Sequence, residues 1–304
     1  MSKILAVFGA TGIQGGSVIK AVLADPVLSK EYTIRGITRD VTKPSAKVLA
    51  DQGVEMVAAD MNSIETARPA VEGAHSVFLV TDYWEKCDHE LELSQGKAVA
   101  DACKAAGVKH LIFSSLINVT EASKGALPNV VHFDSKAAIE QYIRDIGVPA
   151  TFFQPGCYMS NYFDSFRKND DGSYTHALPV DGDTAQFPLI DAAGDTGLFV
   201  KAALRESKPS GKRILGATEY MSPKQIVADF SAVTGKKASF MQVQRDVFKS
   251  FFPPSTAQEI LENVLLLQDP GYYVDADLSP SLALLDRKPT TWKEFVEANK
   301  SKWE

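Results

Sequence analysis

Cysteine is scarce in this sequence, and its placement excludes two common kinds of scaffold. Cys87, Cys103 and Cys157 are the only three, and no two of them have the C-x-x-C spacing. The five histidines show no H-x-H or H-x₃-H spacing either. Disulfide frameworks and structural zinc sites need such pairs or closely spaced sets. We therefore expect no disulfide scaffold, no bound metal and a reducing compartment, the cytoplasm with the nucleus as a second location.

The chain also lacks a long apolar run and a surplus of positive charge. No stretch approaches the ~20 apolar residues of a membrane-spanning helix. The segment Met1–Leu5 leads into a strand without the pattern of a secretory signal. Lysine and arginine number 32 against 38 acidic residues, a formal net charge of −6. Because such a surface offers no basic footprint, we expect no direct binding of nucleic acid and no membrane insertion.

The sequence does contain an alternation of short apolar runs and amphipathic stretches, which is typical of β-α-β units. Six strands are predicted, at Ile4–Phe8, Tyr32–Thr38, Val54–Ala59, Ser76–Val80, His110–Ser114 and Pro149–Gln154. Helices are predicted between them, at Gly15–Ala24, Ala46–Gln52, Ser63–Val71, His89–Ala106 and Phe133–Ile146. This order predicts an α/β fold with a doubly wound parallel sheet of the Rossmann type. Ligands bind such a sheet where the carboxyl ends of its strands meet.

The regular alternation stops in the second half of the chain. We therefore predict a dinucleotide-binding domain over 1–153 and a smaller, mixed, mostly helical C-terminal lobe over 154–304. A helix at Asp191–Leu204 and a strand at Arg213–Leu215 predict that segments near 186–217 return to the first domain. Ser222-Pro223-Lys224-Gln225 and Thr291-x-x-Glu294 have the composition of helix starts.

The segment Gly9-Ala10-Thr11-Gly12-Ile13-Gln14-Gly15 lies directly after the first predicted strand and before the first predicted helix. The pyrophosphate of a dinucleotide needs a tight turn, a close approach of the backbone and the positive end of a helix. Glycines at these spacings supply the turn and the approach, and the helix supplies the rest. The sequence therefore predicts a dinucleotide site at this turn.

The end of the second strand indicates which dinucleotide binds. An acid there would accept a hydrogen bond from the ribose 2′-hydroxyl of NAD, whereas arginine accommodates a 2′-phosphate. This chain has Arg39, followed by Lys43. The guanidinium group can bind a phosphate with two parallel hydrogen bonds. We therefore favour NADP(H); the alternative is a solvated loop in which Asp40 pairs with Arg39.

Three segments, taken in order, resemble the NmrA-like proteins, which are atypical short-chain dehydrogenases/reductases. They are Gly9–Gly16, Val80-Thr81-Asp82-Tyr83-Trp84-Glu85 and His132-Phe133-Asp134-Ser135-Lys136. The similarity runs through the whole chain and is greatest to the redox-sensor (HSCARG-like) branch. Ser94 departs from that branch, in which a basic residue is expected.

The resemblance implies that NADP(H) lies in a cleft between the Rossmann domain and the C-terminal lobe. The residues that would meet its pyrophosphate are Gly9, Ala10, Thr11, Gly12, Ile13, Gln14 and Gly15. Arg39 and Lys43 would bind the 2′-phosphate, Lys136 the nicotinamide ribose, and Tyr158 would lie near the ring. The further cofactor contacts that it implies are Asp60, Met61, Thr81, Asp82, Tyr83, Gly156 and Asn161.

Ordinary members of that superfamily use a Tyr-x-x-x-Lys pair and a serine after the fifth strand. Here Lys136 is present, Ser114 or Ser115 stands at the serine position, and His132 replaces the tyrosine. A neighbouring cation disfavours a charged imidazole, so we expect the pKa of His132 to fall. Three interpretations remain open. In the first, His132 is structural and the protein is not an efficient dehydrogenase. In the second, His132 or Tyr158 replaces the tyrosine and the protein is a reductase. In the third, the acid comes from the second lobe.

An intact cofactor motif beside a lost tyrosine favours a regulator over an enzyme. In that interpretation the protein is a redox sensor whose NADP(H) occupancy changes a surface for a regulatory protein partner, for instance in transcription. The alternative is an NADPH-dependent oxidoreductase acting on a small carbonyl, quinone or enone substrate. Fold alone does not decide between them.

Overall fold

A computed structural model describes residues 2–206 and 208–304, and a seven-stranded parallel sheet is its largest element. The strands lie in the order β11-β6-β5-β4-β1-β2-β3, and every neighbouring pair is parallel. They are β1 (Lys3–Val7), β2 (Tyr32–Thr38), β3 (Glu55–Ala58), β4 (Ser76–Leu79), β5 (His110–Ser114), β6 (Ala150–Pro155) and β11 (Arg213–Gly216). The predicted doubly wound α/β fold is confirmed.

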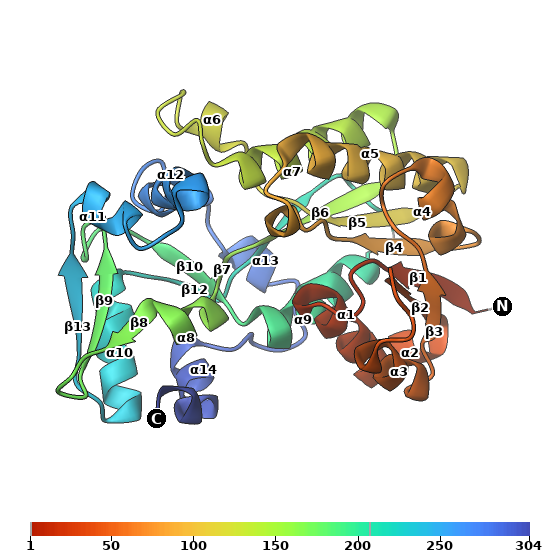
Figure 1. The fold of residues 1–304 in the computed structure, drawn as a ribbon. Helices are drawn as coiled ribbons and strands as arrows, with labels where there is room; N and C mark the ends of the chain where they lie inside the picture. The colour runs from red at the N-terminus through yellow and green to blue at the C-terminus, as the bar shows by residue number, and fades with distance from the viewer. Residues whose placement is uncertain (1, 207) are drawn as a thin grey trace.

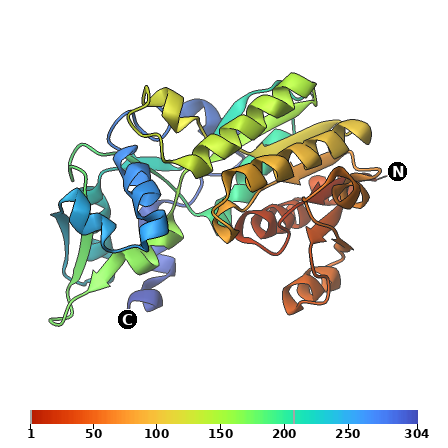
Figure 2. The ribbon, with the colours of Figure 1, turned by 45° about the horizontal axis from the view of Figure 1, so that its top comes forward.

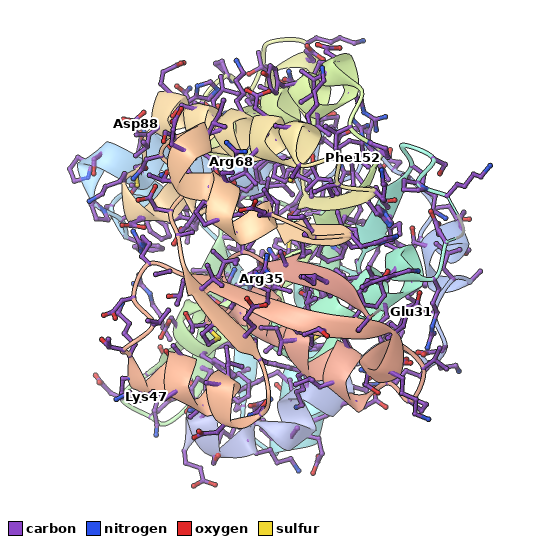
Figure 3. All side chains as sticks on the ribbon, turned by 90° about the vertical axis from the view of Figure 1, so that its right-hand side faces the viewer. Glu31, Arg35, Lys47, Arg68, Asp88 and Phe152 are labelled. Atoms are coloured by element: carbon purple, nitrogen blue, oxygen red, sulfur yellow. The ribbon has the colours of Figure 1, made fainter. Side chains whose placement is uncertain are left out.

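Helices cover both faces of this sheet (Figure 1). On one face pack α4 (Ile64–Val71), α5 (His89–Ala105) and α7 (Val131–Ile146); on the other pack α1 (Ile13–Ala24), α3 (Pro44–Asp51) and α9 (Ala192–Leu204). Figure 2 shows α5 and α7 running side by side. Figure 3 looks onto β2 and β3 and shows Lys47 of α3 and Arg68 of α4 on opposite sides of the sheet. Because both faces are covered, the central strands β4 and β5 are buried along their whole length.

Capping residues mark the ends of several helices close to where the sequence predicts them. Reciprocal capping boxes are present in three places: Ser63 with Thr66 before α4, Ser222 with Gln225 before α10 (Pro223–Thr234), and Thr291 with Glu294 before α14 (Trp292–Ala298). Gly147 ends α7 with a φ of +74°, a left-handed conformation that glycine adopts without strain. In these places the end of the helix is marked by residues that lie within a few positions of it.

The chain returns to the sheet from the second half of the sequence. The predicted strand at Arg213–Leu215 is found as part of β11, which pairs in parallel with β6. The preceding helix α9 packs against α1, and the two backbones approach so closely that a Cβ on Gly197 would lie 2.3 Å from the carbonyl oxygen of Ser17. Residues far apart in sequence therefore complete both an edge and a face of the sheet.

The remaining elements form two small sheets and several helices. The first sheet has the order β12-β10-β7, with β12 (Glu219–Met221), β10 (Phe187–Ile190) and β7 (Cys157–Tyr158). The second has the order β13-β9-β8, with β13 (Ala238–Gln242), β9 (Tyr174–Leu178) and β8 (Phe166–Lys168). The helices not yet named are α2 (Leu28–Glu31), α6 (Val119–Ala122), α8 (Tyr162–Ser165), α11 (Arg245–Lys249), α12 (Pro254–Leu265) and α13 (Ser279–Leu282), with 3₁₀ turns η1 (Tyr83–Glu85), η2 (Met159–Asn161) and η3 (Lys300–Trp303).

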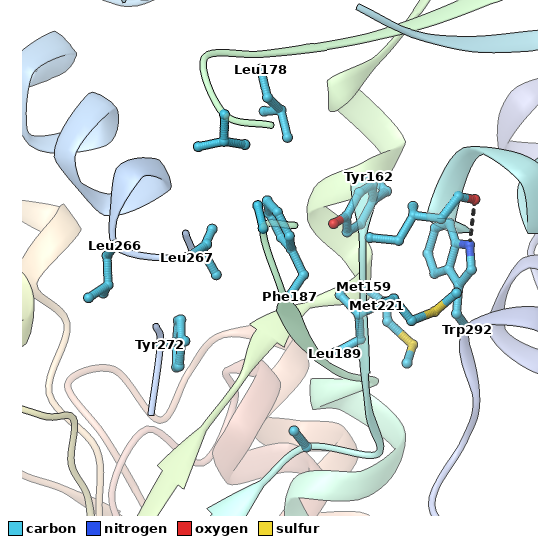
Figure 4. Close-up of a cluster of buried hydrophobic side chains, with 14 of the residues drawn as sticks. Met159, Tyr162, Leu178, Phe187, Leu189, Met221, Leu266, Leu267, Tyr272 and Trp292 are labelled. Carbon is cyan, nitrogen blue, oxygen red and sulfur yellow. Dashed lines mark hydrogen bonds between the residues drawn. The ribbon is translucent and has the colours of Figure 1, made fainter. Parts of the chain in front are cut away.

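An aromatic and aliphatic core holds together the two small sheets and the helices that follow them in sequence, which we call the second lobe (Figure 4). Trp292 is fully buried in it, and its indole N–H donates to the carbonyl oxygen of Ile226 at 3.0 Å. Tyr162 lies with its ring centroid 4.8 Å from that of Trp292.

Within residues 2–206 and 208–304, no helix has the length and apolar character needed to cross a membrane.

Candidate functional site

The glycine-rich turn folds tightly against the start of α1. Gly9 has a φ of +64°, and a Cβ on Gly15 would lie only 2.2 Å from the carbonyl oxygen of Gly9. The N–H of Gly12 donates to that same oxygen at 2.9 Å. Glycine is required at position 9 because of this left-handed backbone conformation. It is required at position 15 because any side chain there would collide with the backbone of the turn.

The start of α1 is suited to hold an anion. Gly12 provides no side-chain cap, and the first turn of this 12-residue helix contains no acidic residue. The positive end of the helix dipole therefore faces the turn without a neighbouring carboxylate in that turn. Thr11, Gly12 and Ile13 are exposed at this point.

Gln14 connects this turn to the second lobe. Its side-chain N–H donates to the hydroxyl oxygen of Tyr158, on β7, at 2.6 Å. Its other polar atom, Oε1, is buried without a hydrogen-bond partner among the described residues. A buried acceptor of this kind is costly unless something donates to it. The uncapped helix start and this acceptor together fit a ligand that carries both phosphates and hydroxyl groups.

Arg39 lies at the exposed end of the site, just after β2. Its Nη1 lies 2.7 Å from Oε1 of Glu85, which comes from the 3₁₀ turn after β4. Asp40 is not its partner, because that carboxylate accepts hydrogen bonds from the N–H and hydroxyl of Thr42. The alternative pairing considered from the sequence is therefore wrong. Lys43 is exposed nearby, at the N-cap of α3.

Asp60 and Met61 follow β3 beside this region. The Asp60 carboxylate accepts from the N–H of Asn62, which lowers its pKa together with the charge of Arg39 at longer range. Met61 is half-buried and packs on the core between the sheet and α4.

Lys136 is fixed by a glutamate that the sequence did not single out. Its Nζ lies 2.5 Å from Oε1 of Glu92, and Thr81 donates to the same oxygen at 2.6 Å. Ser135 donates to the other oxygen of Glu92. The side chain of Glu92 is 1% exposed, so this is a buried carboxylate satisfied by three donors.

The position of Glu92 could have been recognised from helical periodicity. Gly96, Val99 and Cys103 lie on the same face of α5 as Glu92, and all are buried. A charge on that apolar face is a sign of a buried partner, since a lone charge there would be too costly.

His132 occupies the second position of α7, where it contacts the second lobe. Its backbone N–H and its Nδ1 lie 2.9 and 2.6 Å from Oε1 of Glu259, which belongs to α12. The hydroxyl of Tyr83 donates to the other oxygen of Glu259 at 2.9 Å. The Trp84 and Phe133 rings each have a centroid 4.8 Å from that of His132.

The electrostatics of this contact favour a neutral imidazole beside a carboxylate. Burial lowers the pKa of His132; Glu259 opposes that effect, and Lys136 adds to it. The direction is the one expected, but the main cause is burial and not the lysine. Hydrogen bonds from His132 and Tyr83 hold the pKa of Glu259 below its usual range despite its burial. A neutral His132 with its proton on Nδ1 would donate to Glu259 and leave Nε2 as an acceptor.

The other predicted site residues are placed as follows. Ser114 is buried at the end of β5, while the neighbouring Ser115 donates to Oε2 of Glu140 at 2.6 Å. Gly156 is packed so tightly that a Cβ would lie 2.3 Å from the carbonyl oxygen of Pro188. Asp82 and Asn161 are exposed.

A model of the NmrA-like family matches residues 1–296. The chain belongs to the NmrA-like family. The NmrA-like family domain-containing oxidoreductase malD of Malbranchea aurantiaca is 33% identical over 264 residues, which cover 80% of this chain and 76% of that protein.

Solved NmrA-like and reductase structures share the fold over nearly the whole length. The structure of NmrA, a negative transcriptional regulator, in complex with NADP has a TM-score of 0.83 at 23% identity, covering 99% of this chain and 96% of that one. The triphenylmethane reductase of Citrobacter sp. complexed with NADP(H) has a TM-score of 0.78 at 25% identity, covering 97% and 99%.

In this NmrA-like chain, three groups of contacts follow the carboxyl edge of the sheet. They are Gln14 with Tyr158, the carboxylate of Glu92 with Thr81, Ser135 and Lys136, and the carboxylate of Glu259 with Tyr83 and His132. The second lobe contributes Tyr158 and Glu259. The edge that is expected to bind a ligand is therefore also the edge where the two lobes meet.

Proposed function

We propose that this NmrA-like protein binds NADP(H) along the carboxyl edge of the sheet. The tight turn, the uncapped start of α1 and the unmatched acceptor of Gln14 support this. The pyrophosphate would lie against residues 9–15, and the 2′-phosphate against Arg39 and Lys43. Lys136 would bind the nicotinamide ribose near Tyr158. The NmrA and triphenylmethane reductase structures that carry NADP or NADP(H) have the same fold.

We further propose that the protein acts as a redox sensor or regulator. The observation that carries this is the contact of His132 with Glu259. His132 and Lys136 lie one turn apart on α7, so a cofactor held by Lys136 would act on the same helix end that α12 binds. Cofactor occupancy would then change how α12 lies on the first domain, and with it a surface for a regulatory protein partner. The assignment to the redox-sensor branch stays a prediction.

Hydrogen exchange with and without cofactor tests this function. Saturating NADPH or NADP⁺ should change the exchange of residues 254–265, since Glu259 belongs to that helix. Glu259→Gln should still bind the cofactor but lose most of that change, because the amide no longer carries the charge that holds His132. Glu297→Gln, a change at a distant exposed carboxylate of the same lobe, is the matched control. Cofactor binding without any change in α12 would contradict the sensor.

A second candidate function is an NADPH-dependent oxidoreductase. Two observations favour it: Nδ1 of His132 is oriented by a buried carboxylate, while Nε2 has no hydrogen-bond partner among the described residues. The bound cofactor would supply the hydride, and His132 would be placed to exchange the proton at Nε2. The relative at 33% identity is named an oxidoreductase.

Loss of NADPH absorbance with quinones, aldehydes and enones separates the two candidates. Turnover by the wild type that His132→Ala abolishes, with cofactor affinity retained, would establish the oxidoreductase. Absence of turnover with every substrate class, together with the exchange response in α12, would establish the sensor.

A further inference from the structure

Glu85 forms an ion pair with Arg39, the residue that the proposed function assigns to the 2′-phosphate. The Arg39 Nη1 and Glu85 Oε1 atoms lie 2.7 Å apart, at the distance of a charge-assisted hydrogen bond. Arg39 and Glu85 come from different loops, after β2 and after β4, so chain connectivity does not force this pairing. The two side chains are 67% and 37% exposed, and an ion pair in such surroundings is readily broken.

Three carboxylates act on the charge of Arg39. Glu85, Asp82 and Asp60, in that order of effect, raise the pKa of the guanidinium. Lys86 and Lys43 are the neighbouring cations, and both contribute to lowering the pKa of Glu85. A phosphate that approaches Arg39 therefore also meets three carboxylates, which oppose the binding of a dianion.

Glu85 also belongs to the segment that reaches the second lobe. It ends the 3₁₀ turn η1, which begins at Tyr83, and the hydroxyl of Tyr83 donates to Glu259. Glu85 is therefore only two residues from Tyr83, which contacts the second lobe. A movement of Glu85 away from Arg39 would begin close to that contact.

We propose that Glu85 is a specificity-determining residue, which holds Arg39 until a 2′-phosphate displaces it. This inference rests on the proposed binding of NADP(H). NAD(H) has no 2′-phosphate and would leave the pair intact, whereas NADP(H) would break it. Glu85 therefore weakens the binding of NADP(H) selectively and keeps the preference for NADP(H) over NAD(H) small.

Titrations of four proteins with NADP⁺ and NAD⁺ test this proposal. The four proteins are the wild type, Glu85→Gln, Arg39→Ala and the double variant. Calorimetry at low and at moderate salt measures the binding of each dinucleotide. Glu85→Gln should tighten NADP⁺ binding about three- to tenfold and change NAD⁺ binding less than about twofold. In the Arg39→Ala background the same substitution should lose most of that gain, because the competing partner is absent.

Glu90→Gln is the matched control for net charge. Glu90 lies five residues further along the chain, is 84% exposed and is paired with His89 and not with Arg39. It should leave both affinities within about twofold of the wild type, since Glu90 does not hold Arg39 and salt screens the effect of an exposed charge. The fragment 2′,5′-ADP, compared with 5′-AMP, isolates the phosphate from the rest of the cofactor.

Three results would overturn the proposal while leaving the proposed function intact. The first is unchanged NADP⁺ affinity in Glu85→Gln, the second is an equal gain for NAD⁺, and the third is a full gain in the absence of Arg39. If neither the wild type nor Glu85→Gln binds either dinucleotide, the proposed function itself fails and this inference fails with it.

Discussion

Around Lys136 the carboxylates of the candidate site are buried, and around Arg39 they are exposed. The side chains of Glu92 and Glu259 are 1% and 8% exposed, whereas Glu85 is 37% exposed. The same chemical group therefore has two roles. A buried carboxylate with several donors keeps them, because breaking these hydrogen bonds would leave buried polar groups unpaired. An exposed carboxylate exchanges its partner for water, and its partner takes up water or a phosphate, at little cost in free energy.

The largest expected effect comes from removing the buried carboxylate. Glu92→Ala should lower the free energy of unfolding by about 3–5 kcal/mol, because Lys136 then stays partly buried without its counter-charge. Glu90→Ala, on the same helix but exposed, should change it by less than about 0.5 kcal/mol. Denaturant unfolding measures both. Equal losses for the two variants would remove the distinction between the buried and the exposed regions.

Acid should destabilise the protein through its buried histidines. Burial lowers the pKa of His110 and of His176 to about 4, and it also lowers that of His132. Unfolded histidine titrates near ~6.5, so the unfolded chain binds more protons below that pH and stability falls as pH drops towards about 4. Between about pH 7 and pH 5 the loss should be roughly 2–4 kcal/mol.

Urea titrations at several pH values check this dependence. His132→Gln keeps a donor for Glu259 but removes the titration, so it should reduce the slope. His89→Gln, at a histidine whose side chain is 33% exposed, is the matched control. A free energy of unfolding that stays constant from neutral pH to about pH 5 would show that these imidazoles remain accessible to protons in the folded state.

The smallest effect on stability is expected at the exposed pair. Arg39→Ala should change the free energy of unfolding by less than about 0.5 kcal/mol, as exposed ion pairs contribute little. Its effect should appear in binding: NADPH affinity should fall about tenfold or more, with NADH affinity nearly unchanged. Equal losses for the two cofactors, measured by calorimetry, would contradict the assignment of the 2′-phosphate to Arg39.

The sheet and its helix boundaries could be predicted because their signals are local. Apolar runs, glycines at helix ends and capping boxes such as Ser63 with Thr66 each act within a few residues. The small sheets of the second lobe were missed because their strands are short; β7 has only two residues. Their pairings join segments that no sequence pattern connects.

The candidate site was predictable only in part, for the same reason. The glycine-rich turn is a contiguous motif, and Lys136 follows His132 by four positions. Glu259 binds His132 across 127 residues, and Glu85 meets Arg39 across 46. Both glutamates are distant in sequence from their partners, so no local pattern indicates which residue each one binds.

The route of the chain also limits how the protein can be divided. The strand β11 covers the open edge of β6, and α9 covers an apolar face of α1, yet both follow residue 190. A fragment that ends near residue 153 would keep the glycine-rich turn but present an uncovered strand edge and a bare helix face, which promote aggregation. Attempts to transplant the turn as a minimal binding module should therefore carry residues 191–216 with it.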